Sequence, residues 1–266
     1  MMPTVKLTHL QYTQLNPTTW CATAQVSEPL CLSFDTLREK SSWLWVFNTS
    51  TIHFNKMGGL NWQYCSPRVI LSAREMAHQQ RQLQRKGVRL LLQQLLNYLE
   101  LRDTLDESDF PYQLIDSKHY VCFSHTGATP KNAVHHQNLN QSLNTRSNSK
   151  VAVTISRHRP IGIDIETNDV AWHVAQRFYS DNELRVIQSL PTSQRDIITK
   201  LLWQIKESFI KIHQYKLAQG LGVDYSYLIA DLLNAIRDPS SLWVTADSRS
   251  QYHVAILPIQ QTVVIF

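Results

Sequence analysis

Two acidic residues in one short segment of the sequence could act together on a metal ion or a phosphate. Asp164 and Glu166 lie in the alternating residues 160–166, and strand geometry would place them on one face, roughly 6–7 Å apart. Two carboxylates so placed repel each other unless a cation or protons relieve them. Hard oxygen donors at this separation suit Mg²⁺, which often bridges substrate phosphates. The structural alternative is a pair of solvated acids at the edge of a sheet.

A second acidic and basic pair lies further along the chain. Glu207 and Lys211 belong to residues 195–217, which contain neither Gly nor Pro and predict one amphipathic helix. Apolar residues recur there at helical spacing: Leu202, Ile205, Phe209 and Ile212. Residues four apart share a helix face, so an acid and a phosphate-binding cation would project together. The alternative is a solvated surface pair that stabilises the helix by about 0.3 kcal/mol.

A Ser-His pair supplies the third candidate site. Ser124 and His125 follow the apolar and aromatic residues 120–123, and Gly127 comes shortly after them. This order predicts a strand that ends near His125. A lone His at such a position is more often structural than a ligand.

Taken together, the three segments resemble the motifs of the Sfp-type 4'-phosphopantetheinyl transferases, a superfamily that includes holo-[acyl-carrier-protein] synthases. The motifs are a Ser-His pair ending a strand, Gly-Ile-Asp-Ile-Glu, and Trp-x-x-Lys-Glu-Ser-Phe-Ile-Lys, in the family's order. The resemblance runs over residues 123–222. It implies transfer of phosphopantetheine from coenzyme A to a serine of an acidic partner, an apo acyl carrier protein or peptidyl carrier domain. Adenosine 3',5'-bisphosphate would be released.

The resemblance also implies roles for individual residues. Asp164, Glu166 and Glu207 would hold Mg²⁺ against the diphosphate, and Asp164 would also contact coenzyme A. Glu207 would take the proton of the incoming serine, and Lys211 would stabilise charge on the phosphates. The further residues expected to bind coenzyme A are Ser124 and His125, with Lys206 as a weaker candidate.

A basic cluster lies in an expected helix over residues 72–101, where Ser72 and Glu75 would form a capping box. Its basic side chains either form a solvated helix face or, as the resemblance implies, bind the 3'-phosphate of coenzyme A. Arg89 matches an Arg of the family. The other candidates for phosphate contact are Arg81, Arg85 and Lys118, the last standing where the family usually has Gly-Lys-Pro.

The fold implied by the resemblance is α/β (α+β), with two similar lobes related by a pseudo-twofold axis and the active site between them. We expect the N-terminal lobe over residues 1–150 and the C-terminal lobe over residues 151–266, in a monomer that is a pseudo-dimer. Residues 133–150 predict an exposed polar loop. Residues 151–155 and 161–165 alternate as strands, and we expect them to pair across a turn.

Composition narrows the functional classes. The 266 residues carry a formal charge of +5, which is compatible with an acidic partner or a phosphate ligand. The sequence has no dense run of Lys and Arg, so we do not expect it to bind nucleic acid. The four cysteines are dispersed without a Cys-x-x-Cys pair, so a structural zinc site is not expected. We also expect no secretory signal, no membrane span and a cytoplasmic location.

Two alternatives remain open at this point. One is another Mg²⁺-dependent phosphoryl-transfer enzyme or a phosphohydrolase that uses the same carboxylates and releases product with water. The other is a non-catalytic protein that binds coenzyme A or a carrier protein without turnover.

Overall fold

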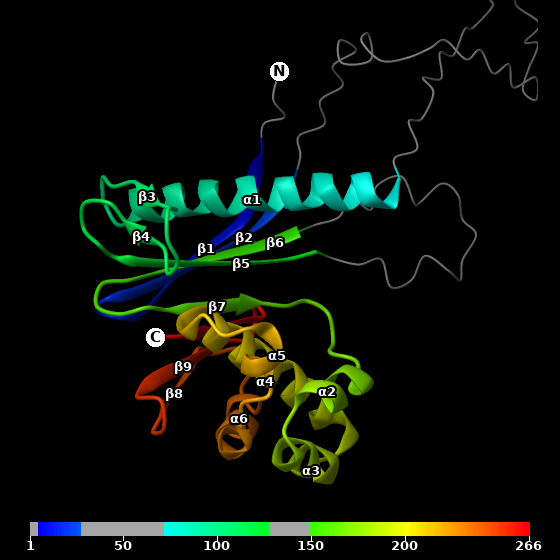
Figure 1. The fold of residues 1–266 in the computed structure, drawn as a ribbon. Helices are drawn as coiled ribbons and strands as arrows, with labels where there is room; N and C mark the ends of the chain where they lie inside the picture. The colour runs from blue at the N-terminus through cyan, green and yellow to red at the C-terminus, as the bar shows by residue number, and fades with distance from the viewer. Residues whose placement is uncertain (1–4, 28–71, 128–148) are drawn as a thin grey trace, which may run out of the picture.

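Two antiparallel sheets form the centre of the protein, and helices cover their outer faces (Figure 1). The computed structural model describes residues 5–27, 72–127 and 149–266. The first sheet has the order β1-β2-β6-β5-β4-β3 and the second the order β7-β10-β9-β8. This mixture of helices and antiparallel strands is an α+β architecture, as the sequence predicted. The pseudo-twofold relation of two lobes stays a prediction.

The first sheet is built from the N-terminal part of the chain and from one later strand. Its strands are β1 (Lys6–Asn16), β2 (Thr19–Ser27), β3 (Leu105–Asp106), β4 (Gln113–Leu114), β5 (Tyr120–Thr126) and β6 (Ser149–Ser156). The 26-residue helix α1 (Ala73–Tyr98) covers one face, and Ser72 and Glu75 form the expected capping box at its start. Its apolar stripe packs on this sheet through Val88, Leu91 and Leu95. The basic residues of α1 therefore remain on its exposed side.

The second sheet comprises β7 (Gly162–Ile165), β8 (Trp243–Asp247), β9 (Tyr252–Leu257) and β10 (Thr262–Ile265). Its helices are α2 (Trp172–Phe178), α3 (Asp181–Ser189), α4 (Thr192–His213), α5 (Leu217–Leu221) and α6 (Ile229–Ala235), with the 3-10 helix η2 (Ser226–Leu228) before α6. The helix α4 buries Leu202, Ile205 and Phe209 in the core beneath this sheet. The predicted amphipathic helix is thus confirmed, although it ends at His213.

The two sheets pack against each other through a third apolar cluster, which includes Cys21, Cys122, Ile163 and Val264. The described part of the molecule therefore has four layers, with α1 outside the first sheet and α2–α6 outside the second (Figure 1). Because strand side chains alternate, Cys122, Ser124 and Thr126 of β5 face the second sheet. This alternation aims the polar end of β5 at β7.

The predicted pairing of residues 151–155 with 161–165 is wrong. Strand β6 pairs with β2 and β5, and β7 pairs with β10. The strand β6 is buried on both faces in the middle of the first sheet, so its neighbours come from distant segments. The change of sheet thus falls after Ser156, and the division into lobes over residues 1–150 and 151–266 stays a prediction.

One expected element lies largely beyond the described residues. The polar loop of residues 133–150 overlaps the segment 128–148, and only its last two residues are described, where β6 begins. In the described part of the chain, no helix is both long and apolar enough to cross a membrane.

Gly162 allows α4 to lie directly against β7. A Cβ atom added at this position would stand 2.1 Å from the backbone oxygen of Ser208. No side chain fits in that space, so the strand and the helix approach through bare backbone. Ser208 follows Glu207 on α4, and Gly162 precedes Asp164 on β7 by two residues. The close approach therefore fixes the distance between the two candidate acidic segments.

We predict that Gly162→Ala destabilises the protein by roughly 1–3 kcal/mol, because the added methyl group must push α4 away from β7. Denaturant unfolding would measure the change. The control is Gly222→Ala, since a Cβ there meets nothing closer than 3.5 Å and the residue already has helical backbone angles. That variant should be neutral or stabilising by less than about 1 kcal/mol. Equal stability of the two variants would contradict the packing constraint.

Candidate active site

Asp164 lies where the two sheets and α4 meet. Its side chain is buried, and its Oδ1 atom accepts a hydrogen bond from Ser124 Oγ at 2.9 Å. The ammonium group of Lys211 donates to the same oxygen at 3.2 Å. A buried carboxylate needs such partners, because a charge that is removed from water without a partner costs much free energy. The residues predicted from β5, β7 and α4 are therefore in direct contact.

The backbone of β7 shares these partners. This strand is at the edge of the second sheet, so among the described residues one row of its backbone groups has no neighbouring strand. Lys211 Nζ donates to the carbonyl oxygen of Ile163 at 2.6 Å, and the N–H of Ile165 donates to Ser124 Oγ at 3.2 Å. Lys211 and Ser124 thus hold both the carboxylate and the strand that carries it.

Glu166 is held by donors that the sequence did not single out. Its Oε1 atom accepts from Thr126 Oγ1 at 2.9 Å, and from the backbone N and Nδ2 of Asn168 at 2.8 and 3.1 Å. The strand period could have found Thr126, which stands two residues after Ser124 on the same face of β5. No sequence pattern pointed to Asn168.

Glu207 and Lys211 project from α4 towards the acids of β7, and the pKa values of both are perturbed. Burial and the nearby charges of Asp164 and Glu166 raise the pKa of Glu207, although Lys211 opposes this. Burial alone would lower the pKa of Lys211, but Asp164 and Glu207 outweigh it and the net pKa is raised. Lys211 therefore stays charged, and Glu207 holds a proton more readily than an ordinary carboxyl group.

Gln204 connects α4 to both sides of the site. Its Nε2 atom donates to the carbonyl oxygens of Asp164, at 3.3 Å, and Gln261, at 2.8 Å. The N–H of Glu166 donates to the same Gln261 oxygen at 3.2 Å. Gln204 precedes Glu207 by about one helical turn, and this spacing could have identified it.

The predicted metal ligands are close enough to interact but do not form a cluster in this arrangement. Among the described residues, no group of three or more His, Cys, Asp or Glu side chains is placed to hold a metal ion. The ammonium group of Lys211 forms an ion pair with Asp164 instead. Still, the charges of Asp164 and Glu166 both act on Glu207, and all three offer hard carboxylate oxygens. The chemistry of these oxygen donors fits Mg²⁺. A metal site shared by the three acids stays a prediction.

His125 is exposed at the end of β5, on the opposite side of the strand from Ser124. Surrounding protein atoms and the charge of Lys211 lower the pKa of its imidazole, and Arg85 contributes in the same direction. Arg85 is thus the α1 residue whose charge is felt at His125. The charge of Arg85 therefore acts on the Ser-His pair from the exposed side of α1.

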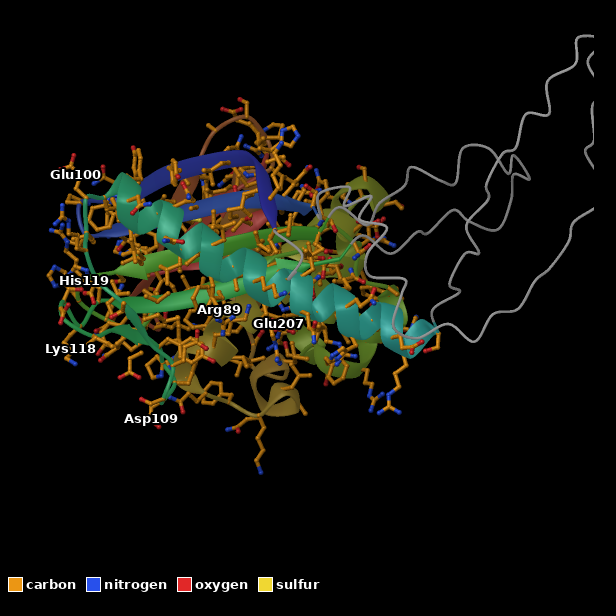
Figure 2. The ribbon with its side chains drawn as sticks, turned by 90° about the horizontal axis from the view of Figure 1, so that it is seen from above. Arg89, Glu100, Asp109, Lys118, His119 and Glu207 are labelled. Atoms are coloured by element: carbon orange, nitrogen blue, oxygen red, sulfur yellow. The ribbon has the colours of Figure 1, made fainter. Side chains whose placement is uncertain are left out.

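The remaining basic candidates lie in different surroundings. Arg81 is exposed on α1, and Arg89 forms an exposed ion pair with Glu107 at 2.5 Å. Lys118 lies in the turn before β5 and is well separated from Glu207 (Figure 2). It precedes Ser124 by six residues, which is about 20 Å along an extended strand. The structure therefore does not bring Lys118 to the acids of β7.

Lys206 has a structural role, which corrects its assignment as a weaker phosphate-binding candidate. Its side chain is fully buried and donates to Glu183 Oε2 at 2.9 Å and to the Leu221 carbonyl oxygen at 2.7 Å. It also donates to the carbonyl oxygen of Val223. Glu183 forms the capping box of α3 with Ser180, and it also pairs with this lysine. The ammonium group therefore has no surface to offer a phosphate.

Comparison with known proteins supports the resemblance over the second sheet and its helices. The family model described as ACPS, 4'-phosphopantetheinyl transferase superfamily, matches residues 160–261. This segment contains Asp164, Glu166, Glu207 and Lys211, but it is less than half of the chain. A search of curated proteins gave no match.

We predict that Lys206→Met destabilises the protein by roughly 3–5 kcal/mol, because Glu183 would remain buried, charged and unpaired. Equilibrium unfolding would measure the loss. Arg89→Met is the control, since it breaks an exposed ion pair and should cost less than about 1 kcal/mol. A Lys206→Met variant as stable as the control would show that the buried pair does not hold α4 to α3.

Proposed function

We propose that the protein transfers the 4'-phosphopantetheine group of coenzyme A to a serine of an apo carrier protein, in an Mg²⁺-dependent reaction. One observation carries the proposal: Asp164 on β7 is bonded both to Lys211 on α4 and to Ser124 on β5. Three separate segments that resemble the motifs of one family thereby meet at one carboxylate. The family-model match over residues 160–261 supports the same reaction class, a transferase.

The metal would be held by Asp164, Glu166 and Glu207, whose charges already interact. When bound, Mg²⁺ would offset the negative charge of the diphosphate and so make its phosphorus a better electrophile. Lys211 supplies a positive charge beside these acids and can bind a phosphate oxygen. Ser124 and Asp164 lie at the same point and would contact coenzyme A there.

The 3'-phosphate of coenzyme A would bind on the side of β5 that faces α1. His125 and Arg85 interact there, and both belong to the exposed surface. Arg81 and Arg89 stand one helical turn to either side of Arg85, so the three guanidinium groups follow one face of α1. Lys118 and Lys206 are not assigned to this site.

The chemical step follows from these positions. The carrier serine oxygen attacks the phosphorus that bears pantetheine, and a new O–P bond forms. Glu207 accepts the serine proton. The bond between that phosphorus and the bridging oxygen breaks, and adenosine 3',5'-bisphosphate leaves. Lys211 stabilises the charge on the departing phosphate and can donate a proton to it.

The proposed partner is an acidic acyl carrier protein or peptidyl carrier domain, which the positive formal charge of +5 would attract. We propose that the protein acts as a monomer in the cytoplasm. No observation on the site favours a phosphohydrolase or a non-catalytic binding protein over transfer.

The reaction is tested by intact-mass analysis of apo carrier proteins incubated with the protein, coenzyme A and Mg²⁺. We expect the carrier to gain the mass of one phosphopantetheine on its serine, and addition of EDTA to stop the gain. Hydrolysis of coenzyme A without carrier modification would instead indicate a phosphohydrolase. Binding of coenzyme A without either product would indicate a non-catalytic protein.

We predict that Asp164→Asn lowers the rate of carrier modification by at least about 100-fold, because a metal ligand loses its charge while the hydrogen-bonding shape remains. Intact-mass time courses would measure the rate, and thermal melting would confirm folding. Asp238→Asn, in an exposed loop bonded to Ser240 and Ser241, is the control and should transfer normally. Normal transfer by Asp164→Asn would remove Asp164 from the mechanism.

We predict that Lys211→Met lowers kcat by roughly 100-fold to 1000-fold, because one preorganised charge on the transferring phosphate is lost. Steady-state kinetics with coenzyme A would measure kcat and KM separately. The control is Lys216→Met, since Lys216 is exposed just beyond the end of α4. If both variants kept the same kcat, Lys211 would have no part in the chemical step.

A further inference from the structure

Three donors converge on one oxygen of Glu166. Thr126 Oγ1 lies 2.9 Å from Oε1, and the backbone N and Nδ2 of Asn168 lie at 2.8 and 3.1 Å. A carboxylate has about four lone-pair sites over its two oxygens, so three donors saturate the oxygen they share. A carboxylate saturated at one oxygen in this way can bind a cation only through its other oxygen, Oε2.

The donors come from both sides of the contact between the sheets. Thr126 is buried at the end of β5 in the first sheet, whereas Asn168 follows β7 of the second. Asn168 Nδ2 also donates to the Gly127 carbonyl oxygen at 3.4 Å, which links the two segments. The carboxylate is therefore fixed in orientation from two directions.

The arrangement repeats a contact one step earlier along both strands. Ser124 and Thr126 are two residues apart on β5, and Asp164 on β7 is two residues before Glu166, which directly follows that strand. Ser124 Oγ bonds to Asp164 and Thr126 Oγ1 bonds to Glu166, each at 2.9 Å. Two hydroxyl groups with strand spacing thus hold two carboxylates with strand spacing.

We propose that Thr126 and Asn168 are positioning residues, which orient Glu166 so that its Oε2 atom faces the divalent cation. This inference rests on the proposed function, since it concerns the same metal site. Outer contacts of this kind fix the direction of a metal ligand, and their loss commonly lowers metal affinity by about 10-fold to 100-fold. A merely structural role would lower stability and leave the affinity for metal unchanged.

The test measures binding of Mn²⁺ alone to the full chain, by the electron paramagnetic resonance signal of the free ion. Thr126→Val keeps the shape of the side chain but removes the hydroxyl group, and we expect about 10-fold to 100-fold weaker Mn²⁺ binding. Thr126→Ser keeps the hydroxyl group and should bind Mn²⁺ as the unchanged protein does. Asn168→Ala should weaken binding less than 10-fold, because its backbone N–H still donates to Glu166.

A matched control exists elsewhere in the second sheet. Thr245 Oγ1 donates to Asp231 Oδ2 at 3.3 Å, so Thr245→Val removes the same type of hydrogen bond between a threonine and a carboxylate. It should leave Mn²⁺ binding unchanged. Thermal melting of all variants would separate a loss of folding from a loss of affinity.

The outcomes separate this inference from the proposed function. Equal Mn²⁺ affinity of the unchanged protein and a folded Thr126→Val variant would overturn the positioning role, while carrier modification could still proceed. If Thr126→Val and Thr126→Ser were both weakened equally, the hydroxyl group would not be the cause and the inference would fail. Absence of Mn²⁺ binding to the unchanged protein would overturn the inference and the metal-dependent mechanism together.

Discussion

The ion pair between Lys211 and Asp164 is the interaction on which the arrangement of this protein depends. Asp164 is only 8% exposed, and two further acids act on the same region. Negative charge at such depth is tolerated only where positive charge and hydrogen-bond donors compensate it. Lys211 can supply that charge only if α4 lies tightly on β7, and the absence of a side chain at Gly162 allows it to do so. The packing of a helix on a strand is thus a condition for the electrostatics of the site.

The parts of the site that could be predicted from the sequence are those fixed by local geometry. The strand period placed Asp164 and Glu166 together, and the helical period placed Glu207 and Lys211 together. The capping box at Ser72 followed from the same kind of short-range rule. The partner of β6 could not be predicted in this way, because a strand buried on both faces takes its neighbours from distant segments. Residues 157–161 suggest a hairpin locally, yet they connect one sheet to the other.

Other features were missed because they depend on contacts between segments far apart in the chain. Lys206 is adjacent to Glu207 in sequence, but the turn of the helix directs it away, into a fully buried pair with Glu183. Lys118 was selected because it stands where the family usually has Gly-Lys-Pro. The strand β5 separates it from Ser124, so Lys118 lies at the opposite end of this strand, far from Glu207 (Figure 2). Thr126 and Asn168 gain their importance only from the carboxylate that the fold brings to them.

The side-chain contacts along β7 have a consequence for the solubility of the protein. An uncovered strand margin is a template on which another polypeptide can add by main-chain pairing, and this is a common route to aggregation. Here the carbonyl oxygen of Ile163 and the N–H of Ile165 are already bonded to Lys211 and Ser124, within the packing of the two sheets. An incoming chain would have to displace those side chains first. The residues proposed for catalysis therefore also protect the protein from self-association at this strand.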